Sequence, residues 1–102
     1  MVHIEITSWF PSSKNQEVTN KYIEVLQDPG MPSSVKSFKI FSKATKGGTR
    51  TIAYLEIEPG KMEEAYTDMA PILETFSEIE GYSFEYGIAL SQEEVLAAQQ
   101  QG

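Results

Sequence analysis

The sequence predicts an α+β fold in which two helices cover one face of a four-stranded antiparallel sheet. Three observations predict it. Apolar residues alternate along four short segments as they do in strands, and they recur at helical spacing in two segments between those strands. Gly47-Gly48 separates two adjacent strand-like segments, as a hairpin turn would. The predicted order is β-α-β-β-α-β with a short C-terminal helix, and 102 residues form one domain, residues 1–102.

The first predicted strand, residues 1–10, has two different faces. Alternation places Val2, Ile4 and Ile6 on the side that packs against a core. The opposite side carries polar and aromatic groups, which are His3, Glu5, Thr7 and Trp9. Because this face carries an imidazole, a carboxylate and an indole, the function of the protein depends on what packs against or binds to it.

The first helix is predicted over residues 14–27, where Val18, Tyr22 and Val25 form an apolar stripe. Ser13 and Gln16 have the spacing of a capping box at its start. The helix ends before Pro29, because proline disfavours helical geometry at the residue that precedes it.

The two central segments, residues 35–43 and 49–58, predict a hairpin. With Gly47-Gly48 as the two-residue loop, Phe41 lies opposite Tyr54 and Lys39 lies opposite Glu56. This register gives one apolar face and an opposite-charge pair on the other.

A second helix is predicted over residues 61–79, with Pro71 inside it, where proline kinks a helix or divides it in two. The last strand, residues 82–90, alternates between an apolar face and a polar face. Ser91 and Glu94 then form a second capping-box pattern, at the start of a helix that runs through residue 98.

Short connections and right-handed crossovers favour the strand order 4-1-3-2, with the first and third strands central and both helices on one face. The other face then carries Trp9, Phe41, Ile52 and Tyr54, an apolar patch large enough to indicate a partner. We therefore expect a homodimer that packs sheet against sheet through this second face, with a partly polar interior. As an alternative to this sheet-to-sheet contact, or in addition to it, the C-terminal helix covers the second face or packs against the partner.

With this order over residues 1–90, and with His3, Trp9 and Tyr54 facing a potential cavity, the chain resembles the dimeric α+β barrel superfamily, whose fold is ferredoxin-like. That superfamily includes antibiotic-biosynthesis-type monooxygenases, stress-responsive A/B barrel proteins, muconolactone-isomerase-like enzymes and many uncharacterised proteins. Residues 4–9 and 57–61 are most similar to an uncharacterised branch. The resemblance implies a dimeric barrel and assigns no catalytic residue.

Six residues of the second face are the candidate ligand-binding residues, namely His3, Glu5, Trp9, Phe41, Arg50 and Tyr54. The aromatic side chains suit an apolar or aromatic molecule, and Arg50 near Trp9 suits an anionic group on it. The same side chains are also the usual anchors of a dimer interface, so both interpretations stay open.

The one histidine, His3, is either a base, a haem or metal ligand, a substrate hydrogen-bond partner, or a residue at the rim of the sheet beside Glu56. Glu5, Glu56 and Glu85 form a proton shuttle, a divalent-metal site together with His3, or solvated and paired carboxylates. Their spacing matches no recognised metal motif, so no metal and no cofactor is expected. Besides a ligand-binding protein, the alternatives are a cofactor-independent monooxygenase or isomerase and a structural or regulatory assembly protein.

Composition limits the partners. Eight basic and fifteen acidic residues give a net charge of −7, which argues against nucleic acid and anionic membranes. Without cysteine there is no thiolate chemistry or disulfide, and no apolar run approaches the roughly 18 residues that span a bilayer. Without a visible signal peptide, we expect a cytoplasmic protein. Ser8 is interpreted as a strand-end residue.

Overall fold

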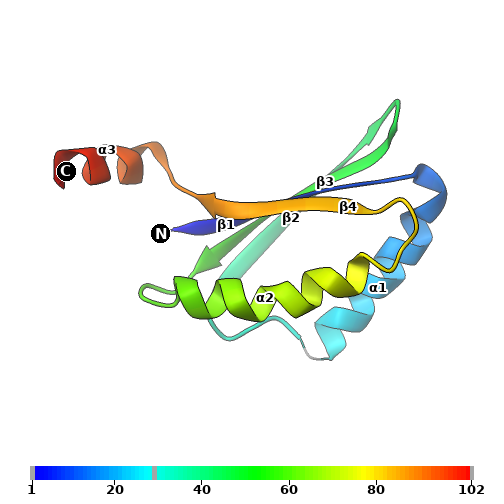
Figure 1. The fold of residues 1–102 in the computed structure, drawn as a ribbon, viewed down its shortest axis with the longest axis horizontal. Helices are drawn as coiled ribbons and strands as arrows, with labels where there is room; N and C mark the ends of the chain where they lie inside the picture. Colours follow the sequence, from blue (N-terminus) through cyan, green and yellow to red (C-terminus); the bar gives the residue numbers. More distant parts are fainter. Residues whose placement is uncertain (1, 29, 102) are drawn as a thin grey trace.

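A computed structural model describes residues 2–28 and 30–101. Its elements are β1 (His3–Phe10), the 3-10 turn η1 (Ser12–Lys14), α1 (Asn15–Gln27), β2 (Val35–Thr45), β3 (Gly48–Ile57), α2 (Met62–Phe76), β4 (Ser83–Ala89) and α3 (Gln92–Gln101). The four strands form one antiparallel sheet in the order β2-β3-β1-β4, which confirms the predicted topology. Helices α1 and α2 cover one face of this sheet, and α3 lies beyond the end of β4 (Figure 1).

The core lies between this sheet and α2. Ile4 and Leu55 come from the two central strands, lie opposite each other and are almost fully buried. The side chains of α2 that pack with them are Ala65, Met69, Ile72, Leu73 and Phe76. The predicted inner face of the first strand is therefore confirmed at Ile4 and Ile6.

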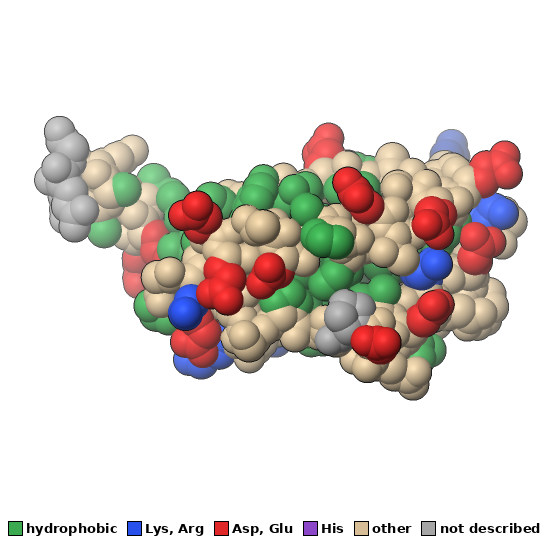
Figure 2. Space-filling model, turned by 60° about the horizontal axis from the view of Figure 1, so that its bottom comes forward, with side chains coloured by type: hydrophobic (Ala, Val, Ile, Leu, Met, Phe, Trp, Pro, Cys, Tyr) green, Lys and Arg blue, Asp and Glu red, His purple; other side chains and the backbone are tan. Residues whose placement is uncertain are grey.

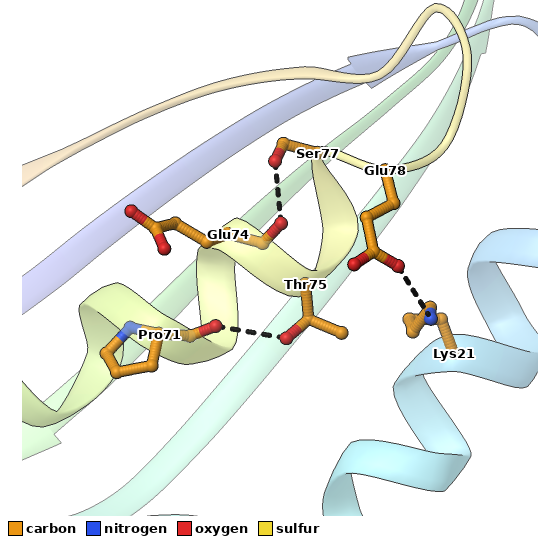
Figure 3. Close-up of polar contacts among 6 residues, drawn as sticks. All are labelled: Lys21, Pro71, Glu74, Thr75, Ser77 and Glu78. Atoms are coloured by element: carbon orange, nitrogen blue, oxygen red, sulfur yellow. Dashed lines mark hydrogen bonds and ion pairs between the residues drawn. The ribbon is translucent and has the colours of Figure 1, made fainter.

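Helix α1 is held less closely than α2, since Val25 is its one buried residue. At its start the Thr49 hydroxyl donates a hydrogen bond of 2.6 Å to Asn15 Oδ1. Further along, Lys21 Nζ lies 3.8 Å from Glu78 Oε2, just after the end of α2 (Figure 3). Because the glutamate is largely exposed, this ion pair contributes little to stability.

The helix ends differ partly from the prediction. Ser13 does not cap the first helix, because η1 occupies this segment and Lys14 is the N-cap residue of α1. The Ser91 box is confirmed, since Ser91 Oγ accepts a hydrogen bond of 3.1 Å from the Glu94 backbone N–H and Ser91 N–H donates to Glu94 Oε1 at 2.8 Å. Pro71 lies inside α2 without dividing it, and the helix ends at Phe76, before residue 79.

The predicted hairpin register is wrong by two residues. Thr45 pairs with Gly48, so the loop is Lys46-Gly47, and Phe41 lies opposite Ile52 instead of Tyr54. Lys39 lies opposite Tyr54 rather than Glu56. A shift of two residues keeps every side chain on its predicted face, because side chains alternate with a period of two.

We expect Gly48→Ala to lower the free energy of unfolding by about 2 kcal/mol or more, because of strain and a steric clash. Gly48 has φ +133°, and a Cβ atom there would collide with the carbonyl oxygen of Phe10. Urea denaturation of both proteins measures the difference. Gly47→Ala is the matched control, since its Cβ would have no neighbouring heavy atom within 4 Å. Equal midpoints for the two variants would contradict this account of the turn.

Candidate functional site

The six predicted site residues lie together on the sheet face that points away from the helices, called the outer sheet face below. The central pairing of β1 with β3 places His3 opposite Glu56, Glu5 opposite Tyr54, and Trp9 opposite Arg50. Phe41 joins them from β2, on the far side of β3. The expected neighbourhood of Trp9 and Arg50 is thus confirmed, while ligand binding by these six residues stays a prediction.

The aromatic side chains of the outer sheet face are exposed in the single chain. Trp9 keeps 39% of its surface exposed, Tyr54 38% and Phe41 58%. The rings of Phe41 and Tyr54 meet edge to face at 6.4 Å, as diagonal neighbours on adjacent strands. Monomeric proteins seldom leave so many large aromatic groups in water on one face.

Charge divides the outer sheet face into two halves. The half formed by β2 and β3 carries Lys39, Lys43 and Arg50 together with one glutamate, Glu56, and the half formed by β1 and β4 carries Glu5 and Glu85. Beside Glu5, the register position of β4 is Gly87, which has no side chain. A shallow hollow of about 280 Å³ opens there between the two glutamates.

The expected Lys39–Glu56 pair does not form in the register of the structure. Glu56 instead accepts a hydrogen bond of 3.3 Å from the Ser37 hydroxyl and lies 3.9 Å from Lys36 Nζ. The Lys36–Glu56 contact occurs beside a β-bulge between Val35 and Ser37, which leaves Lys36 without a cross-strand partner on β3.

A larger cavity of about 300 Å³ lies on the opposite side of the sheet, between the strands and both helices. We call it the helix-side cavity. Its walls are apolar for the most part, with Ile6, Ala53 and Leu55 from the sheet and Val18 and Leu73 from the helices among them. The cavity exists because α1 buries so little against the strands beneath it. In Figure 2, hydrophobic side chains gather in the middle of the helix-covered side, with Asp and Glu side chains around them.

The polar groups of the helix-side cavity are hydroxyls. Tyr82 donates a hydrogen bond of 2.8 Å to Ser8 Oγ, and its ring stacks between Phe10 at 5.7 Å and Phe76 at 5.5 Å. Burial raises the pKa of Tyr82, against the smaller opposing effect of this hydrogen bond, and burial also raises the pKa of Tyr22. None of the described lining residues is an Asp, Glu, His, Lys or Arg.

The sequence interpretation missed this cavity and misread Ser8. Ser8 is 3% exposed and shares the inner face of β1 with Ile4 and Ile6, so it is a buried residue and not a strand-end one. Its parity with those isoleucines was the available signal, because a serine on a core face needs a hydrogen-bond partner. The spacing of apolar residues, by contrast, does not predict the gap between α1 and the sheet.

Within residues 2–28 and 30–101, no group of three or more His, Asp or Glu side chains is arranged to hold a metal ion. Among those same residues, no helix has the length and apolar character that crossing a membrane requires.

We expect Tyr82→Phe to lower the free energy of unfolding at pH 7 by about 1 kcal/mol, because the buried Ser8 hydroxyl loses its donor. The ordinary phenol pKa is 10.0, and the folded-state value lies above it. The unfolded chain therefore loses this proton first, so the folded protein loses stability as pH rises above about 10. Urea titrations at pH 7 and pH 10.5 test this. The alkaline loss should be smaller in Tyr82→Phe than in the control Tyr54→Phe, and identical losses would contradict the assignment.

Comparison with known proteins establishes the fold of the chain. No protein-family model and no curated protein matches the chain. Among solved structures, a putative antibiotic biosynthesis monooxygenase from Deinococcus radiodurans matches with TM-score 0.65 and 7% identity, over 89% of this chain and 92% of that one. A dimeric ferredoxin-like protein from an uncultured marine organism matches with TM-score 0.66 and 13% identity, over 89% and 94%.

A third similar structure is SnoaB, a cofactor-independent oxygenase from Streptomyces nogalater, with TM-score 0.62 and 6% identity over 89% of this chain and 93% of that one. Identities this low establish a shared fold and nothing about the reaction. The chain therefore has the ferredoxin-like fold that these proteins share, which confirms the fold implied by the resemblance noted in its sequence.

Proposed function

We propose that this chain is a homodimeric binding protein for a small, neutral, apolar or aromatic molecule, which it holds in the helix-side cavity. The observation that carries the proposal is a preformed space of about 300 Å³ with apolar walls and hydroxyl groups. Such spaces suit drug-sized ligands, which are oriented by a few polar groups in a mostly apolar site.

The chemistry of the lining determines the class of ligand. With no charged side chain in the described wall, an ionised ligand would lose its hydration without gaining a counter-ion. Hydroxyls of Ser8, Ser42 and Thr51 can each pair with one hydroxyl or carbonyl oxygen of a neutral ligand. Among the described lining residues there is also no carboxylate or imidazole to serve as a base near neutral pH, so we propose binding rather than an oxygenase or isomerase reaction.

The outer sheet face is proposed as the homodimer interface. A two-fold axis parallel to the strands, between β1 and β3, puts the β2–β3 half of one copy over the β1–β4 half of the other. The half with Lys39, Lys43 and Arg50 then lies over the half of the second copy that carries Glu5 and Glu85, so the more basic half of each copy meets the acidic half of the other. An axis across the strands would stack like charges, which costs binding free energy. The dimeric state of the ferredoxin-like marine protein supports this proposal by analogy only.

In such a dimer the six predicted residues on the outer sheet face become the walls of its interior. Trp9 and Arg50 are adjacent on the sheet and supply the kind of aromatic and guanidinium anchors that interfaces favour. The hollow beside Glu5 leaves space for a side chain of the second copy. We assign these residues to the interface first and to a ligand second.

For the cavity, we expect Ala53→Phe to weaken binding of the neutral fluorescent probe N-phenyl-1-naphthylamine by about tenfold or more, since the added ring occupies the space the probe needs. Ala53 lines the cavity, whereas Ala44 does not and is exposed on the neighbouring strand. Ala44→Phe is therefore the matched control. Fluorescence titration measures both affinities. Failure of the unchanged protein to bind this and other neutral aromatic probes would refute the proposed ligand class.

For the dimer, we expect Ile52→Asp to raise the dissociation constant by about 100-fold or more, because it buries an unpaired carboxylate in the middle of the interface. Ile52 lies between Phe41 and Thr7 on the outer sheet face. Ile23→Asp is the control, since Ile23 is 49% exposed on α1. Light scattering across a concentration series measures the mass. A monomeric unchanged protein at micromolar concentration would overturn the proposed interface.

A further inference from the structure

The C-terminal helix α3 lies away from the two helices that cover the sheet of its own chain. Figure 1 shows it beyond the end of β4, away from α1 and α2. Leu96 on this helix is 47% exposed, and Leu90 in the link that leads to it is also 47% exposed. A helix that exposes its leucines is typical of a segment that is buried in a larger assembly.

The mouth of the helix-side cavity lies between α1 and the edge strand β2. Among the residues that line the cavity, those with the most exposed side chains mark its opening, and the large apolar ones are Leu26, Phe38 and Ile40. Phe38 and Ile40 are 36% and 39% exposed, although both point to the helix-covered side of the sheet. β2 is an edge strand, so its outer side has no neighbouring strand among the described residues.

The charges of these two regions are opposite. Five of the eight basic residues of the chain lie on the β2–β3 hairpin, namely Lys36, Lys39, Lys43, Lys46 and Arg50. No acidic residue occurs between Asp28 and Glu56. The last part of the chain, from Glu85 to the C-terminus, contains Glu85, Glu93 and Glu94 and no Lys or Arg. Lys36 and Lys39 lie at the end of the hairpin where β2 starts, so in an acidic protein this end can attract an acidic segment.

The two-fold arrangement proposed above brings these regions together. On the sheet, Ser37 near the start of β2 and Ala89 at the end of β4 share the same end of the strands. With the axis parallel to the strands, the start of β2 in one copy lies over the end of β4 in the other. The α3 that follows this β4 therefore emerges beside the exposed edge of the first copy's β2.

We propose that α3 of a second copy packs along the edge of β2, over Phe38 and Ile40, and closes the mouth of the helix-side cavity. Leu96 covers the apolar pair, and Glu93 lies near the lysines of β2. Each ligand site is then completed by the other subunit. This inference rests on the proposed homodimer, and it adds a lid that is supplied in trans.

Cysteine pairing tests the placement, and the chain has no cysteine of its own. Phe38→Cys and Leu96→Cys variants are mixed, unfolded and refolded together, and oxidised. We expect a disulfide-linked species of twice the chain mass, which neither variant forms alone. Ile23→Cys mixed with Leu96→Cys is the control pair, because Ile23 lies on α1 and does not line the cavity.

Probe release tests the lid. We expect Leu96→Asp to speed dissociation of N-phenyl-1-naphthylamine by about tenfold in stopped flow, as loss of an interface contact acts mostly on the dissociation rate. Ala98→Asp is the control, since helical geometry places residue 98 on the side of α3 opposite Leu96. Both substitutions are at exposed positions, so both chains should fold.

The outcomes separate this inference from the proposed function. A dimer that binds the probe but gives no more Phe38–Leu96 cross-link than the control pair overturns the lid alone. An internal disulfide in the Phe38→Cys/Leu96→Cys double variant, without a covalent dimer, also overturns it, because α3 would then cover its own chain. A covalent dimer that binds no probe supports the helix placement and refutes the ligand site.

Discussion

The pairing of β1 with β3 is the contact on which the rest of the structure depends. It sets Ile4 against Leu55 on the inner side and, one residue away, Glu5 against Tyr54 on the outer side. Because side chains alternate along both central strands, this one register separates a core from a second, partly polar surface. The helix-side cavity and the outer sheet face therefore lie on opposite sides of the same strands. Successive residues of a strand point alternately to one and to the other, so neighbouring substitutions affect different surfaces.

The unequal packing of the two helices explains where the cavity lies. Helix α2 buries five of its residues in the core, while α1 buries Val25 alone. The lost burial has a free-energy cost, since each apolar side chain left partly exposed forgoes about 1 kcal/mol or more of transfer free energy. The side chains whose burial is incomplete in this way include Leu26, Phe38 and Ile40. A ligand and a covering helix would each recover part of it.

Much of the fold could be predicted from the sequence, because faces and element order follow from periodicity. The strand order, the inner face of β1 and the Ser91 cap are examples. The hairpin register could not, since a slip of two residues leaves the same faces, and only the turn geometry at Gly48 distinguishes the alternatives. Nor could the cavity, because a gap between α1 and the sheet depends on helix placement, which no spacing of apolar residues encodes.

The distribution of charge links the two sides of the sheet. Concentrating basic residues on one hairpin of an acidic chain leaves the single copy with a strong electrostatic asymmetry. Lysines along an edge strand also discourage unwanted strand pairing, so part of this pattern protects the free edge of β2. Protection alone does not require Lys39, Lys43 and Arg50 to face outward beside exposed aromatic rings. In the proposed homodimer, the half of a second copy's sheet that carries Glu5 and Glu85 would satisfy both needs at once.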